Sequence, residues 1–195
     1  MGWSLSTGFI ERDMRGTPNN LNDDTFAISV AGMDSRMLKG VDGNYHTVDE
    51  SFWRIQYSST VDVWTAWDKD GTKYLFGYPK FEQSQDDNQS TAIYPYEDGD
   101  CDGNPHIHMI PWRWALSHVV SPGGKMLRYE YQRDLQDKKP TCSNIVGLYQ
   151  TTVAIYPKRI IYPNEQYRVE FELEGRQDYN TTWEGSSSLL FYESK

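Results

Sequence analysis

The most regular pattern of apolar and polar positions lies in residues 166–174, QYRVEFELE, where the two kinds of side chain alternate strictly. A period of two places one set on the core face of a β-strand and the other in water, whereas a helix would scatter both around its axis. The pattern therefore predicts a strand with Glu170 and Glu172 exposed. Its buried face is predicted to consist of Tyr167, Val169, Phe171 and Leu173.

Turn residues between β-rich segments predict two hairpins. They join residues 61–67 to 72–76 through Asp68-Lys69-Asp70-Gly71, and residues 112–120 to 125–132 through Ser121-Pro122-Gly123-Gly124. The glycines in these turns can adopt the positive φ that tight hairpins need. Further strands are predicted at residues 26–30, 51–57, 148–155, 159–162 and 188–192. No segment sustains a period of 3.6 residues, so little helix is expected.

Three polar stretches are predicted to be loops: residues 15–24, 82–108 and 133–144. The second is rich in Asp and Glu and contains neither Lys nor Arg. A structureless loop of that length is uncommon in a compact domain and generally has a function or is mobile. Residues 82–108 are therefore the first place to look for a site.

Composition supports a single domain over residues 1–195. The chain contains 14 Tyr, 7 Trp and 7 Phe, punctuated by 15 Gly and 9 Pro, a mixture that favours strands joined by many turns. We therefore expect an all-β fold of antiparallel sheets with hairpins, long loops and little helix. A chain of this length can bury one substantial core.

Charge excludes two classes of partner. The balance of 19 Lys and Arg against 28 Asp and Glu gives a net charge of −9. A nucleic-acid-binding domain needs a cationic face, and an anionic membrane surface would repel this chain. No apolar run approaches the roughly 20 residues of a membrane span, and the N-terminus shows no signal-peptide pattern.

An ordered series of short motifs resembles a known family. The family is the N-terminal domain of the Salmonella plasmid virulence protein SpvB, of toxin-complex B subunits and of related Rhs (YD-repeat) proteins. The series covers most of the chain, although no single motif is specific. In chain order the motifs are GWSLSTGFIER, NLNDDTFAIS, ESFWRIQY, VWTAWDKDGTKYLFG, WRWALSHVVSPGGKMLRYEYQ and YPKRIIYPNEQYRVEFELEGRQD.

The resemblance implies a β-rich, non-catalytic structural module that helps to wall a toxin-enclosing shell. It implies partners among the other domains or subunits of such a shell, and a secreted or cell-surface location. Two features depart from the family pattern: the turn Ser121-Pro122-Gly123-Gly124 replaces an Asp…Gly-Asn turn, and the acidic insert is longer. The chain has no YD repeats and no toxin domain, so we expect a fragment or a stand-alone module of a larger protein.

A candidate calcium loop lies in the acidic stretch. Asp98, Asp100, Asp102 and Asn104 place side-chain oxygens at alternate positions, with Gly103 providing a bend, as in the first half of a DxDxDG loop. An EF-hand would continue to a bidentate Glu at the twelfth position, which is Met109 here. Two interpretations stay open: a Ca²⁺ site completed by distant residues, and, more simply, a solvated acidic turn with no cofactor.

The two cysteines and a histidine pair offer a second metal hypothesis. Cys101 and Cys142 could form one disulfide between loops, which a domain of this size does not require. His106 and His108 lie two apart near Cys101, so a transition-metal site can be imagined. Solvated or backbone-bonded histidines are the simpler interpretation.

Trp112 and Trp114 are the candidate binding residues, because on a regular strand both rings share a face and could stack on a sugar. Cross-strand aromatic packing is the plainer interpretation. No nucleophile elbow, phosphate loop or metalloprotease motif occurs, so we expect no enzyme activity. The favoured hypothesis is a structural module; the alternatives are a carbohydrate-binding β-sandwich that uses exposed Trp, and a glycoside-active enzyme with paired carboxylates.

Overall fold

The computed structural model describes residues 7–18, 20, 22–77, 89–97, 107–142, 147–174, 180–183 and 190–193. Within these ranges the chain is almost entirely strand, and the helical element is one 3₁₀ turn, Pro163–Glu165. The expected all-β antiparallel fold is confirmed. The strands are β1 (Phe9–Asp13), β2 (Thr25–Val30), β3 (Met33–Lys39), β4 (Tyr45–Thr47), β5 (Arg54–Ser58), β6 (Val63–Trp67), β7 (Lys73–Phe76), β8 (Thr91–Glu97), β9 (Ile107–Val120), β10 (Met126–Lys138), β11 (Tyr149–Ile161), β12 (Arg168–Glu170), β13 (Asn180–Trp183) and β14 (Leu190–Glu193).

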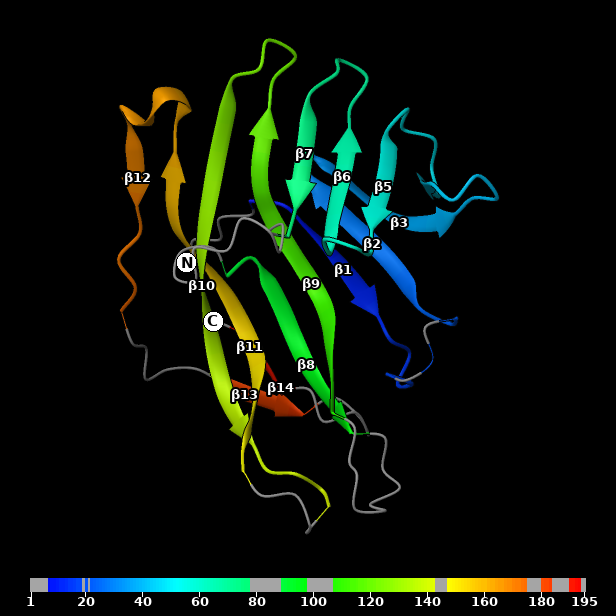
Figure 1. The fold of residues 1–195 in the computed structure, drawn as a ribbon, viewed down its shortest axis with the longest axis vertical. Coiled ribbons are helices and arrows are strands. Elements are labelled where there is room, and N and C mark those ends of the chain that lie inside the picture. Colours follow the sequence, from blue (N-terminus) through cyan, green and yellow to red (C-terminus); the bar gives the residue numbers. More distant parts are fainter. Residues whose placement is uncertain are drawn as a thin grey trace.

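Eight of the strands close into an antiparallel barrel. β1 to β7 pair in chain order, β7 pairs with β9, and β9 pairs in turn with β1 (Figure 1). β9 closes the ring because it pairs with β7 along one edge and with β1 along the other: Phe76 of β7 lies opposite Leu116, and Ile10 of β1 lies opposite Trp114. Closure leaves no free edge around the ring, which removes the hazard of unpaired strand groups.

Two long hairpins extend below the barrel. β8 pairs with the first half of β9, and β10 pairs with β11 over most of their lengths (Figure 1). The hairpins contact each other: the backbone N–H of Ile93 in β8 donates to Thr152 Oγ1 in β11 at 3.1 Å. β12 continues the sheet beyond β11. β13 and β14 form a separate two-stranded sheet.

The barrel interior is the main hydrophobic core. Inward positions of the ring strands are occupied by large apolar side chains, with Trp64, Ile10, Ile55 and Phe76 fully buried. A second, smaller cluster lies where the two hairpins meet, around Trp112, Ile110, Ala92 and Met14. The two-residue alternation of each strand delivers one side chain in two to these cores.

Two predicted loops contain strand. β8 and the start of β9 lie inside residues 82–108, and β10 continues through 133–138. Sequence reasoning missed β8 because Pro95 interrupts the strand pattern. The proline is tolerated because, among the described strands, β8 forms a backbone ladder only with β9, as an edge strand does. The end of β10 is exposed on both faces, so it pairs with β11 through its backbone while its side chains carry no alternation.

The strand predicted over residues 166–174 is the clearest error. Only Arg168–Glu170 form β12, and Tyr167, Val169 and Leu173 are 72%, 41% and 50% exposed, while Phe171 is half-buried. Glu170 and Glu172 are exposed as predicted. Among the described strands β12 pairs only with β11, and none of them covers its apolar face, so an alternation typical of burial here faces water.

Candidate functional site

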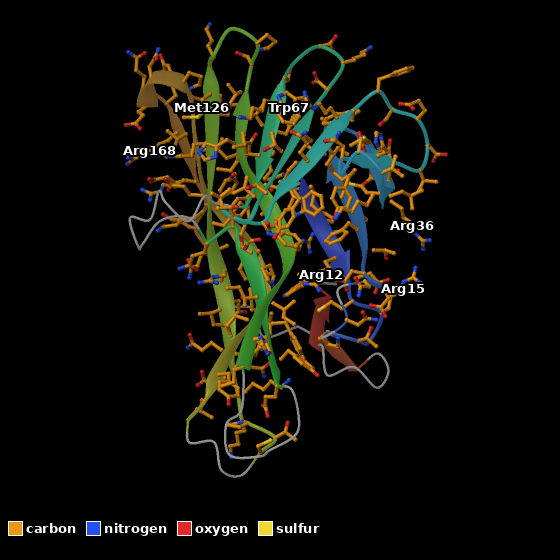
Figure 2. The ribbon with its side chains drawn as sticks, turned by 45° about the vertical axis from the view of Figure 1, so that its right-hand side comes forward. Arg12, Arg15, Arg36, Trp67, Met126 and Arg168 are labelled. Carbon is orange, nitrogen blue, oxygen red and sulfur yellow. The ribbon has the colours of Figure 1, made fainter. Side chains whose placement is uncertain are left out.

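A cavity with a volume of about 740 Å³ opens at the lower mouth of the barrel. Alternate connections of an antiparallel barrel lie at the same end, and this end contains the β1–β2, β3–β4 and β5–β6 connections. They line the cavity with Pro18 and Asp24, with Gly43, and with Ser59, respectively. Tyr96 of β8 and the start of β9 form the remaining wall. Arg12 marks this region in Figure 2, with Trp67 toward the opposite end.

Aromatic rings form the floor of the cavity. Trp64 lies at their centre, with ring centroids 4.7 Å from Tyr45, 4.7 Å from Tyr57, 5.0 Å from Phe26 and 5.8 Å from Trp114. The arrangements are tilted or edge-on, as the ring quadrupoles favour. Trp64 itself is fully buried, so the surrounding rings meet the cavity while Trp64 supports them from the core.

Asp62 fixes two of these rings. Its Oδ1 accepts a hydrogen bond from Tyr57 Oη at 2.8 Å and another from Trp114 Nε1 at 3.0 Å. Asp62 adopts φ +58°, a conformation that costs free energy in a non-glycine residue and often occurs at functional sites. Burial raises the pKa of Tyr57, and the neighbouring charge of Asp62 raises it further, so the phenol stays protonated and donates.

Glycine is required beside this arrangement. Gly77, at φ +79°, lies so close that a Cβ built there would be 2.8 Å from Trp114 Cδ1 and 3.0 Å from the backbone oxygen of Asp62. A side chain at this position would push the Trp114 ring out of place.

A buried ion pair forms part of the cavity wall. Arg12 Nε donates to Asp24 Oδ2 at 2.9 Å, and the two side chains are only 7% and 3% exposed. Arg12 Nη1 also approaches the backbone oxygen of Pro111 at 3.4 Å, which ties β1 to β9. The other carboxylate oxygen, Asp24 Oδ1, is buried without a hydrogen-bond partner among the described residues. The wall therefore contains an acceptor with unused capacity.

No protein-family model matches the sequence, and no curated protein matches it. Among solved structures, the chain is similar to TcdB2-TccC3, with a TM-score of 0.50 and 19% identity over 83% of this chain and 8% of that one. The predicted resemblance is confirmed at the level of the fold. It shows the fold alone, because identity is low and this chain spans less than a tenth of the TcdB2-TccC3 chain.

Two further solved structures are similar. One is the N-terminal domain of the effector protein SpvB from Salmonella typhimurium strain LT2, with a TM-score of 0.47 and 19% identity over 85% of this chain and 56% of that one. The other is a Photorhabdus luminescens Tc holotoxin pore, with a TM-score of 0.45 and 20% identity over 83% of this chain and 8% of that one.

The predicted tryptophan platform is not formed. Trp112 and Trp114 are 8% and 2% exposed, so neither presents a free ring face to a sugar. The physical reason is that β9 runs through both cores: Trp112 packs in the hairpin cluster, and Trp114 in the barrel. Cross-strand aromatic packing, the plainer interpretation of these residues, describes them correctly.

The predicted calcium loop, Asp98, Asp100, Asp102 and Asn104, lies outside the described residues and stays a prediction, as do Cys101 and His106. Cys142 is buried and disulfide-bonded. His108 is exposed on β9 at the cavity rim. Among the residues that the structure describes, no group of three His, Cys, Asp or Glu could hold a metal ion, and no helix is long and apolar enough to cross a membrane.

Sequence reasoning missed the residues of the barrel mouth. Asp24 falls in a predicted loop, and Asp62 lies at the start of the predicted strand 61–67. Tyr57 ends the predicted strand 51–57, and Arg12 ends the motif GWSLSTGFIER. The one available signal is the acidic pair Asp23-Asp24 immediately before a strand. It does not indicate a partner, because Arg12 is 12 positions earlier and meets Asp24 only through β1–β2 pairing.

Asp62→Ala is expected to lower the free energy of unfolding by about 1–3 kcal/mol, because it leaves the buried Trp114 N–H without an acceptor and removes the Tyr57 bond. Asp62→Asn is the matched control: it keeps an acceptor oxygen and tolerates positive φ, so most of the stability should remain. Urea unfolding measures both. Equal losses in the two variants would contradict the role assigned to the acceptor.

Proposed function

We propose that this chain is a non-catalytic structural module that packs against neighbouring β-structure in a larger secreted or cell-surface assembly. The observation that carries the proposal is the uncovered apolar face at the end of the sheet, formed by Tyr167, Val169 and Leu173 beside β12. Strict alternation over residues 166–174 is typical of a strand with one buried face, yet this chain supplies no described element to bury it.

The free edge of β12 supports the same proposal. Among the described strands, β12 ends the sheet, and its outer edge is available to pair with another strand. Soluble domains rarely leave both an apolar face uncovered and a strand edge unpaired, except where another chain or domain binds. The fold similarity to TcdB2-TccC3 is in keeping with this, since that protein is a much longer chain of a toxin complex.

Amide hydrogen exchange over residues 166–174 tests the proposal. The isolated 195 residues are compared with the product of the natural gene, expressed with whatever coding sequence flanks this chain. We expect slow exchange and burial of Tyr167 and Leu173 in the natural product, and fast exchange in the isolated chain, because a neighbour completes the sheet. Residues of β6, a barrel strand that is paired on both edges, serve as the internal control and should exchange slowly in both samples.

Two outcomes would contradict the proposal. One is a natural gene product that consists of this chain alone, remains monomeric and exchanges rapidly over residues 166–174. The other is turnover of a polysaccharide, glycoside or ester by the purified chain that a single Asp, Glu or His substitution abolishes without loss of stability. The second outcome would favour the glycoside-active alternative, which needs two carboxylates across a cleft.

A further inference from the structure

We propose that the barrel-mouth cavity is a saccharide-binding site, in which a pyranose ring stacks on Tyr57 and its hydroxyls bind Asp24, Arg12 and Lys39. The cavity volume of about 740 Å³ lies within the range of small-molecule sites, and mouths of β-barrels are a preferred location for them. The site is distinct from the apolar face beside β12, so it requires neither that face nor a larger assembly.

Tyr57 offers the stacking surface. It is 36% exposed, the most open ring of the aromatic floor, and its inner side packs against Trp64 and Trp114. The hydrogen bond from its hydroxyl to Asp62 holds the ring in one orientation. A ring fixed in this way gives a flat apolar surface at little cost in conformational entropy, which the C–H face of a pyranose can cover.

The polar groups of the wall fit a polyhydroxyl ligand. Asp24 is acceptor-only and has a buried oxygen without a partner, whereas Arg12 and Lys39 are donor-only. Adjacent sugar hydroxyls can donate to the carboxylate and accept from the cations at the same time. A purely apolar ligand would leave the Asp24 oxygen unpaired, and a fully ionised phosphate ester has no hydrogen to donate to it.

Binding of defined sugars to the purified chain tests this inference. The probes are the hexasaccharides of β-1,4-glucose, α-1,4-glucose, β-1,4-N-acetylglucosamine and β-1,4-mannose, with inorganic phosphate and ATP as non-sugar probes. Saturation-transfer NMR detects contact with the sugar protons, and titration followed by intrinsic fluorescence gives the affinity. We expect at least one hexasaccharide to bind and the phosphate probes not to bind.

Substitutions locate the site. Tyr57→Ala should weaken binding by about tenfold or more because it removes the stacking ring. Lys39→Ala should also weaken it, and because Lys39 is exposed this variant keeps the fold even if Tyr57→Ala does not. Trp67→Ala is the matched control, an aromatic residue toward the other end of the barrel that lies outside the cavity lining (Figure 2).

Each remaining outcome overturns the inference. The first is that no hexasaccharide binds, and the second is that only phosphate or ATP binds. The third is that a sugar binds with an affinity that Lys39→Ala and every folded Tyr57 variant leave unchanged. Loss of binding in Trp67→Ala with retention in Lys39→Ala would place the sugar elsewhere on the surface.

Discussion

Replacing Trp64 by alanine is expected to lower the free energy of unfolding by about 3–5 kcal/mol, the largest loss expected for a single side chain of this barrel. Trp64 is fully buried and contacts Phe26, Tyr45, Tyr57 and Trp114. Truncation removes the ring from the centre of this set and leaves a cavity that strand backbones, paired on both sides, cannot close. Urea unfolding monitored by circular dichroism measures the change.

Trp67 provides the matched control on the same strand. It is half-buried and outward-facing, with the Arg54 guanidinium 5.1 Å from its ring centroid. Trp67→Ala should therefore cost about 1 kcal/mol, the size of an exposed cation–π contact and a partly covered ring. Similar losses in the two alanine variants would contradict the assignment of the barrel interior as the main core.

The variant Trp64→Phe separates the contribution of ring packing to stability from that of the unsatisfied indole N–H. Trp64 Nε1 is buried without a hydrogen-bond partner among the described residues. Trp64→Phe loses part of the ring but also removes this unsatisfied donor, so the two effects oppose each other. We expect a loss of about 1–2 kcal/mol, well below that of the alanine variant.

Glu130→Ala is expected to destabilise the chain by about 2–4 kcal/mol, because it removes a buried carboxylate that pairs with two arginines of the β10–β11 sheet. Glu130 is almost fully buried and pairs with Arg128 Nε at 3.3 Å and with Arg159, which lies directly opposite on β11. The arginines are 35% and 26% exposed, so water compensates part of the loss, and the expected value lies below that of a fully buried pair.

Glu170→Ala is the control for this ion-pair cluster. Glu170 pairs with Arg168 at 3.0 Å on β12, but both side chains are more than half exposed. Such a surface pair contributes about 0–1 kcal/mol, and salt screens it. Thermal unfolding at low and moderate ionic strength distinguishes the two. If Glu130→Ala and Glu170→Ala shifted the melting temperature equally, burial would not be what makes the Glu130 cluster stabilising.

Local patterns were sufficient to predict the strand content and the central hairpins. The turns at Asp68–Gly71 and Ser121–Gly124 join β6 to β7 and β9 to β10 as their residues predict. In the first, Asp68 Oδ1 accepts hydrogen bonds from the backbone N–H of Asp70 and of Thr72, both at 2.9 Å. Such turns form from residues adjacent in sequence, so their chemistry can be identified without the rest of the chain.

Other strands could not be predicted because their stabilisation comes from pairing and not from a buried face. The polar end of β10 forms a ladder with β11, and β8 contains a proline that only an edge position tolerates. Conversely, the alternation over residues 166–174 predicted burial that the described chain does not provide. A side-chain pattern specifies which face is apolar; whether another surface covers that face depends on what lies beside it in space.

The sequence by itself determined the fold class, the positions of the two turn-defined hairpins and the family resemblance, because each depends on residues close in the chain. Closure of the barrel, by contrast, requires β1 to meet β9 more than a hundred residues later, as in the pairing of Ile10 with Trp114. The contacts of the barrel mouth also depend on tertiary structure: Asp62 accepts a hydrogen bond from Trp114, 52 positions later, and Arg12 meets Asp24 through strand pairing. Only tertiary structure brings such residues together, since their sequence separation carries no periodic signal.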